Sequence, residues 1–120
     1  MKLRTSIIGI LGVIGLLTAL TGLLAPTKVI TGDHFSATTL SNLRAYSGAG
    51  VVMAIFALYS LSRKQFQDTA LIMLIISLGG WEIGQTISYF ADGKPNSFTI
   101  GSIVVQALLI PLVWKALKSK

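Results

Sequence analysis

Residues 5–25 read TSIIGILGVIGLLTALTGLLA, and this uncharged stretch decides the fold class. A helix that crosses the hydrocarbon core of a bilayer needs roughly 20 mostly apolar residues at about 1.5 Å each. The stretch meets that length, whereas the apolar region of a cleaved signal peptide has only roughly 7–15 residues. No small-x-small cleavage site precedes Pro26. We therefore expect a membrane-spanning helix here, in preference to the alternative of a signal peptide.

Three further segments have the same character. They cover residues 40–61, 69–90 and 98–117, and each carries a single charge: Arg44, Glu82 and Lys115 respectively. Ser41-Asn42 or Thr38-Thr39 is the expected cap of the second helix. The connections are short, which favours antiparallel neighbours. The sequence thus predicts an all-α fold, a single domain over residues 1–120 that forms an antiparallel bundle of four transmembrane helices.

The composition supports this class. Of the 120 residues, 52% are hydrophobic and 12% are charged, about half the charged fraction of a soluble domain. Because cysteine is absent, disulfides and thiolate chemistry are excluded. His34 is a lone histidine, so we expect no metal site and no cofactor. The net charge of +6 comes from basic residues that flank the apolar segments, so membrane topology explains it and we expect no nucleic-acid binding. We also expect no enzymatic activity.

The basic residues also predict the orientation. One side of the predicted bundle holds seven of them, and the other holds two or three, depending on how Arg44 near the boundary is counted. The seven are Lys2, Arg4, Arg63, Lys64, Lys115, Lys118 and Lys120, and the other side holds Lys28 and Lys94. Since cytoplasmic loops carry the excess of Lys and Arg, both termini should be cytoplasmic.

Small residues form stripes on three of the helices, at spacings that place them on one face. They are Gly12, Gly15, Ala19 and Gly22, then Gly50 and Ala54, then Gly80 and Gly84. In a membrane such stripes let helices approach closely. We expect helix packing, within the chain or between copies. The alternative is a groove in which a ligand or an acyl chain contacts the backbone.

The scarce polar residues share a depth in the outer half of the bilayer. They are Asn42, Arg44, Tyr46, Glu82, Gln85, Tyr89 and Gln106, with Glu82 and Gln106 roughly 12 Å deep. Polar groups at that depth are costly and face the protein interior, a partner or water. Glu82 is expected to pair with Arg44 or to hydrogen-bond Gln85 and Gln106. The alternatives are a protonated carboxyl without function and a residue that lines a ligand or ion pathway. Arg44 either reaches the headgroup region or recognises an anionic headgroup.

Residues 42–48, NLRAYSG, resemble the N-x-R-x-x-x-G signature of domain-of-unknown-function family 4345, small four-helix bacterial membrane proteins. Gly84-Gln85 followed by residues 92–95, DGKP, is similar to the second signature of that family. The resemblance covers nearly the whole chain and implies a bacterial inner membrane and no established activity. The family often has arginine at the position of Gln85 and glutamate at that of Gln106. The resemblance therefore implies that a neutral amide pair replaces a charged pair here.

These features favour a small non-enzymatic inner-membrane protein that binds lipid or another amphiphile in an intramembrane cavity lined by the seven polar residues. Such a protein would influence envelope lipid balance or the permeability barrier. Two alternatives remain: a transporter or channel for small or hydrophobic solutes, and an accessory subunit of a larger complex. Membrane lipids are the expected partners. A homo-oligomer is also expected, with a trimer weakly favoured over a dimer.

Overall fold

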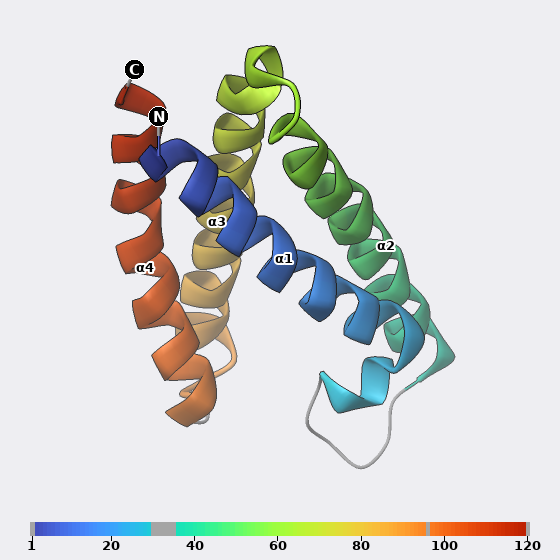
Figure 1. The fold of residues 1–120 in the computed structure, drawn as a ribbon. Coiled ribbons are helices and arrows are strands. Elements are labelled where there is room, and N and C mark those ends of the chain that lie inside the picture. Colours follow the sequence, from blue (N-terminus) through green and yellow to red (C-terminus); the bar gives the residue numbers. More distant parts are fainter. Residues whose placement is uncertain (1, 30–35, 96, 120) are drawn as a thin grey trace.

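The computed structural model describes residues 2–29, 36–95 and 97–119; His34 and Lys120 lie outside this part. The chain forms four long helices, α1 (Lys2–Leu24), α2 (Ala37–Ser60), α3 (Gln67–Ala91) and α4 (Ser97–Lys118) (Figure 1). Two short 3₁₀ helices, η1 (Pro26–Lys28) and η2 (Lys64–Phe66), lie in the connections. Each of the four long helices is long and apolar enough to span a membrane. The predicted all-α class with four transmembrane helices is therefore confirmed.

The helix ends differ from expectation at the start of α2. The helix begins at Ala37, and its N-cap is Ser36, whose side chain accepts a hydrogen bond from the backbone N–H of Thr39 at 3.1 Å. The expected caps, Ser41-Asn42 or Thr38-Thr39, were therefore wrong. The reason is that the polar residues after Ser36 continue as the first turn of the helix. At the end of α3, Gly93 has a positive φ of 103°, a conformation that glycine adopts without a steric cost.

The stripes of small residues on α1 and α2 pack these two helices against each other. A Cβ added to Gly12 would lie 2.8 Å from Leu58 Cδ2, and one added to Gly50 would lie 3.2 Å from Ala19 Cβ. At Gly22 an added Cβ would collide with the Oγ of Ser47, a residue that is buried. Close packing is thus the role of these glycines, because any side chain would push the helices apart.

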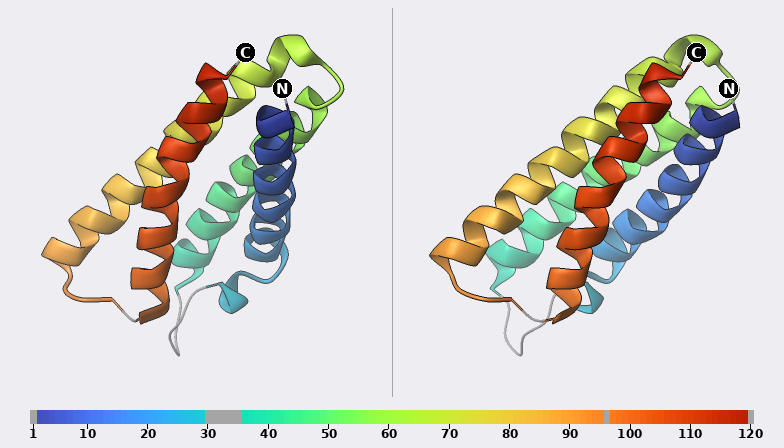
Figure 2. Two further views of the ribbon diagram at one scale, coloured as in Figure 1. Left: turned by 60° about the vertical axis from the view of Figure 1, so that its left-hand side comes forward. Right: turned by 90° about the vertical axis from the view of Figure 1, so that its left-hand side faces the viewer.

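All four helices meet at only one end of the molecule, which we call the closed end. Its buried cluster comprises Ile7 and Ile8 from α1, Ala57 from α2, Ala70 and Leu71 from α3, and Val113 and Ala116 from α4. Arg4 on α1 also forms an ion pair with Asp68 on α3. The start of α1, the end of α4 and the α2–α3 connection lie here (Figures 1 and 2).

The opposite end, which we call the open end, is arranged differently. The α1–α2 hairpin and the α3–α4 hairpin diverge from the closed end towards it (Figures 1 and 2). The divergence of the hairpins is clear at Gly80 and Gly84 of α3, where an added Cβ would meet no atom within 4 Å. The expectation that these two glycines pack helices together was therefore wrong within the chain; packing between copies remains a prediction.

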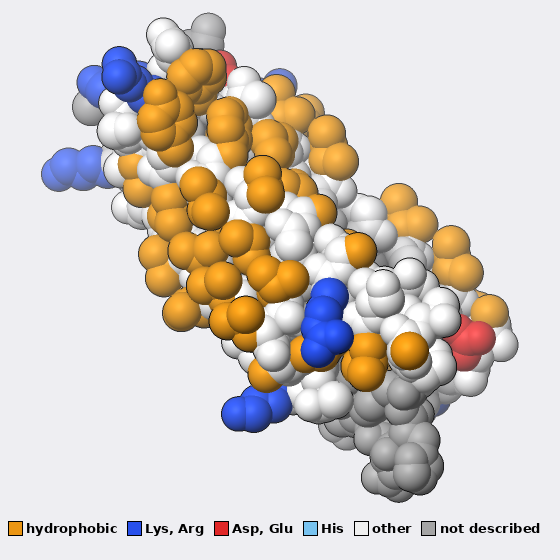
Figure 3. Space-filling model, turned by 90° about the vertical axis from the view of Figure 1, so that its right-hand side faces the viewer, with side chains coloured by type: hydrophobic (Ala, Val, Ile, Leu, Met, Phe, Trp, Pro, Cys, Tyr) orange, Lys and Arg blue, Asp and Glu red, His pale blue; other side chains and the backbone are white. Residues whose placement is uncertain are grey.

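The outer surface has the polarity that lipid requires. Large apolar side chains are exposed along the helices, among them Leu17 at 62%, Val52 at 68% and Phe90 at 82%. Figure 3 shows hydrophobic side chains over the middle of one face and Lys and Arg side chains towards its two ends. Water would not solvate such a surface favourably, whereas acyl chains do.

Candidate functional site: a cleft between the two hairpins

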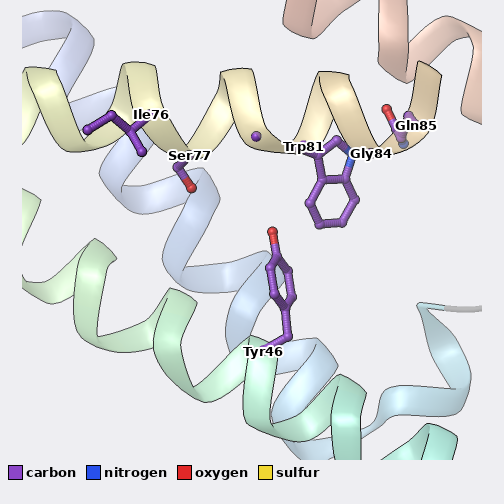
Figure 4. Close-up of a pocket in the computed structure, with 7 residues that line it drawn as sticks. Tyr46, Ile76, Ser77, Trp81, Gly84 and Gln85 are labelled. Atoms are coloured by element: carbon purple, nitrogen blue, oxygen red, sulfur yellow. The ribbon is translucent and has the colours of Figure 1, made fainter. Parts of the chain in front are cut away.

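A cleft of about 500 Å³ lies where the hairpins diverge. It is lined by one residue of α2, Tyr46, and by six residues of α3: Ile76, Ser77, Gly80, Trp81, Gly84 and Gln85 (Figure 4). Volumes of roughly 300–1,000 Å³ are typical of small-molecule sites. Because the lining residues belong to membrane-spanning segments, the cleft lies at the level of the bilayer.

The lining follows from the periodicity of α3. Residues at spacings of three and four share one face of a helix, and Ser77, Gly80, Trp81, Gly84 and Gln85 follow that spacing. The two glycines leave the backbone bare between the larger side chains. The face is therefore concave, and Gly80 and Gly84 are exposed within it. The alternative expected for this stripe, a groove in which a ligand or an acyl chain contacts the backbone, stays a prediction, and the open space beside Gly80 and Gly84 is compatible with it.

Two aromatic side chains span the cleft. The rings of Tyr46 and Trp81 lie 5.4 Å apart between centroids, at an interplanar angle of 43°. The tyrosine hydroxyl points from α2 towards α3, and the indole ring of Trp81 extends from α3 into the space between the helices (Figure 4). A tilted aromatic pair contributes about 0.5–1.5 kcal/mol beyond its area burial. The pair therefore connects the two hairpins at the cleft, between the closed end and the open end.

Three buried oxygens in this region have no hydrogen-bond partner among the described residues: the Oε1 atoms of Glu82, Gln85 and Gln106. Gln106 does donate from Nε2 to Ser102 Oγ at 3.0 Å, within α4. Glu82 Oε1 thus accepts no hydrogen bond from the Gln85 or Gln106 amide N–H groups, and the expected hydrogen bonds of Glu82 to these two residues are not formed among the described residues. An unpaired buried polar atom costs about 1–3 kcal/mol. Of these three residues, Gln85 alone also lines the cleft.

The expected ion pair between Glu82 and Arg44 was also wrong for the residues that the structure describes. Arg44 is exposed on α2 and lies two residues from Tyr46, about 200° further around the helix. Its side chain is not part of the cleft lining. The reason is geometric: the face of α2 that points towards α3 carries Tyr46, and the hairpins already diverge at this depth.

The seven predicted site residues thus divide into groups. Tyr46 and Gln85 line the cleft, whereas Asn42 is exposed outside it and Glu82 and Gln106 are partly buried elsewhere on α3 and α4. Tyr89 lines a second, smaller groove of about 220 Å³, together with Thr86, Phe90 and residues of α4. The sequence reasoning missed Ile76, Ser77 and Trp81. Their spacing from Gly80, Gly84 and Gln85 was the signal that could have identified them.

Four spanning helices with an intramembrane cleft define a small polytopic membrane protein. The chain belongs to the family described as Domain of unknown function (DUF4345), whose model matches residues 3–117. The resemblance noted in residues 42–48 is thereby confirmed over nearly the whole chain. No curated protein and no solved structure matches the chain.

Proposed function

We propose that this protein binds a lipid or another amphiphile in the cleft between its hairpins and performs no catalysis. The cleft offers an apolar wall from Ile76 and Trp81, with hydroxyl and amide groups from Tyr46, Ser77 and Gln85. Ligand sites have this composition, an apolar lining with a few placed polar groups. A molecule with an apolar tail and a polar head satisfies both parts.

One observation carries the proposal: the glycine stripe of α3 is open. Gly80 and Gly84 have no neighbour within 4 Å of a Cβ position, although both lie in a membrane-spanning helix. Packing against another helix would normally use such a stripe. An acyl chain that lies along the bare backbone would gain the dispersion contacts that the divergent hairpins do not supply.

The orientation and location belong to the same proposal. The start of α1, the α2–α3 connection and the end of α4 lie at the closed end (Figure 1). These segments carry Lys2, Arg4, Arg63, Lys64, Lys115 and Lys118. This bias supports cytoplasmic termini. The cleft then opens towards the outer half of a bacterial inner membrane. There the protein would influence the lipid balance of the envelope.

The test is a variant that fills the cleft. Gly84→Leu places a side chain where nothing lies within 4 Å, so the fold should tolerate it while the cleft loses its volume. Native mass spectrometry of protein extracted with a mild detergent should show lipid adducts on the parent protein. We expect their occupancy to fall at least fivefold in Gly84→Leu.

The matched control is Gly101→Leu. Gly101 lies on α4, is exposed, and has no neighbour within 4 Å of a Cβ position, yet it lines neither groove. Its adducts should equal those of the parent. A parent protein without adducts, or equal adduct losses in both variants, would rule out the cleft as a lipid site.

A further inference from the structure

We infer that the ligand of the cleft is an uncharged lipid with a hydroxyl headgroup, of the diacylglycerol type, and not an anionic phospholipid. This inference rests on the proposed function and adds the chemical class of the ligand. Three observations carry it: the charge of the lining, its depth, and the neutral hydrogen-bonding groups that line it.

Among the residues that the structure describes, the lining holds no charged side chain. Its polar members are a phenol, a hydroxyl, an indole and a primary amide, from Tyr46, Ser77, Trp81 and Gln85. A phosphate headgroup is normally held by Arg or Lys, and Arg44 is exposed outside the cleft. The lining therefore favours a neutral headgroup.

The depth of these groups leads to the same conclusion. Tyr46 lies nine residues from the start of α2 at Ala37, which is about 14 Å along the helix. Gln85 lies six residues from the end of α3 at Ala91, which is about 9 Å. A phosphodiester at that level would lose its hydration without gaining a counter-ion. A hydroxyl group loses much less hydration free energy than a phosphodiester. It recovers that free energy through one or two hydrogen bonds.

The hydrogen-bonding groups fit a hydroxyl in particular. The cleft is lined by the hydroxyls of Tyr46 and Ser77, the indole of Trp81 and the amide of Gln85. A ligand hydroxyl would donate to the Tyr46 oxygen, while the indole N–H of Trp81 donates to a ligand oxygen. A hydroxyl group both donates and accepts, whereas an ionised phosphate only accepts.

The experiment compares two lipids that differ only in the phosphate: dioleoylglycerol and dioleoylphosphatidic acid. Each is titrated into purified full-length protein in mild detergent, and complexes are quantified by native mass spectrometry. We expect dioleoylglycerol to bind at least tenfold more tightly. In Gln85→Leu that preference should fall about tenfold. In Gln106→Leu it should persist, because this second buried amide oxygen lies outside the cleft.

The outcomes separate the two proposals. If phosphatidic acid binds as tightly as dioleoylglycerol, and Gly84→Leu abolishes both, the lipid site stands and the neutral headgroup is wrong. If Gln85→Leu and Gln106→Leu behave alike, the assignment of Gln85 is wrong. If neither lipid binds, both proposals fall. A dimer mass that disappears in Gly84→Leu would show that a second copy occupies the cleft, and would also overturn both.

Discussion

At the scale of single residues, glycine has two opposite roles in this chain. Gly22 lies where α1 meets the buried Ser47, whereas Gly84 borders open space. Replacing either by alanine gains about 0.5–1 kcal/mol of helix propensity. At Gly22 the new methyl also overlaps Ser47 Oγ, which typically costs about 1–3 kcal/mol. We therefore expect Gly22→Ala to be less stable than Gly84→Ala by about 1–3 kcal/mol in an SDS-unfolding titration from bicelles.

The double variant Gly22→Ala/Ser47→Ala is the control for this prediction, because it removes the oxygen that the methyl would meet. It should recover part of the stability lost in Gly22→Ala. Equal stabilities for Gly22→Ala and Gly84→Ala would contradict the close approach of α1 and α2 at this point.

At the scale of elements, α3 combines a structural half with a half that lines the cleft. Leu71, near its start, is fully buried in the closed-end cluster, while one face of the later part, from Ile76 to Gln85, lines the cleft. Leu71→Ala should therefore destabilise the fold. Lipid also solvates an exposed leucine, so the loss of unfolding free energy comes from lost packing alone. We expect a loss of about 2 kcal/mol, near the lower end of the range for Leu→Ala in soluble proteins.

Ile72 provides the matched comparison for Leu71. It is the next residue of α3 and 45% exposed, so Ile72→Ala should change the stability by less than about 0.5 kcal/mol. The measurement is the same unfolding titration, monitored by the circular dichroism of the helices. Similar losses for both variants would show that the closed end is not the stabilising core.

At the scale of the whole molecule, the hairpins are joined at one end and diverge at the other. The chain has no cysteine, so single cysteines can be introduced at chosen positions and spin-labelled without a background signal. Labels at Ser41→Cys and Ile87→Cys report on the open end, and labels at Ser62→Cys and Lys115→Cys report on the closed end. We expect a broader distance distribution for the open-end pair in double electron–electron resonance. Distance distributions of equal width for the two pairs would show that the separation of the hairpins varies no more at the open end than at the closed end, which would contradict this prediction.

The orientation proposed for the molecule is testable with single cysteines. Lys94→Cys lies in the α3–α4 connection at the open end, and Ser62→Cys follows α2 at the closed end. A membrane-impermeant maleimide should label Lys94→Cys in intact spheroplasts and should label Ser62→Cys only after lysis. The reverse pattern would place the termini outside and the cleft in the inner leaflet.

Prediction from the sequence succeeded where one physical constraint was sufficient. The spans follow because a helix must satisfy its own backbone in lipid, so length and polarity alone define them. The packing of Gly12 and Gly22 agrees with the tendency of small residues at helical spacing to bring membrane helices together, although Gly80 and Gly84 have the same spacing and do not pack within the chain. The cap at Ser36 was missed because several Ser and Thr residues nearby could serve equally well as the cap.

The functional site shows the limit of that reasoning. The sequence by itself determined that the chain is a bundle of four membrane-spanning helices, since apolar length is a local property that neighbours cannot change. It could not show that Arg44 and Glu82 lie apart, or that Gly80 and Gly84 face a cleft. Those facts depend on the angle between two hairpins. That angle is decided by contacts among Ile8, Leu71 and Val113, which are far apart in the chain and meet only in the tertiary structure.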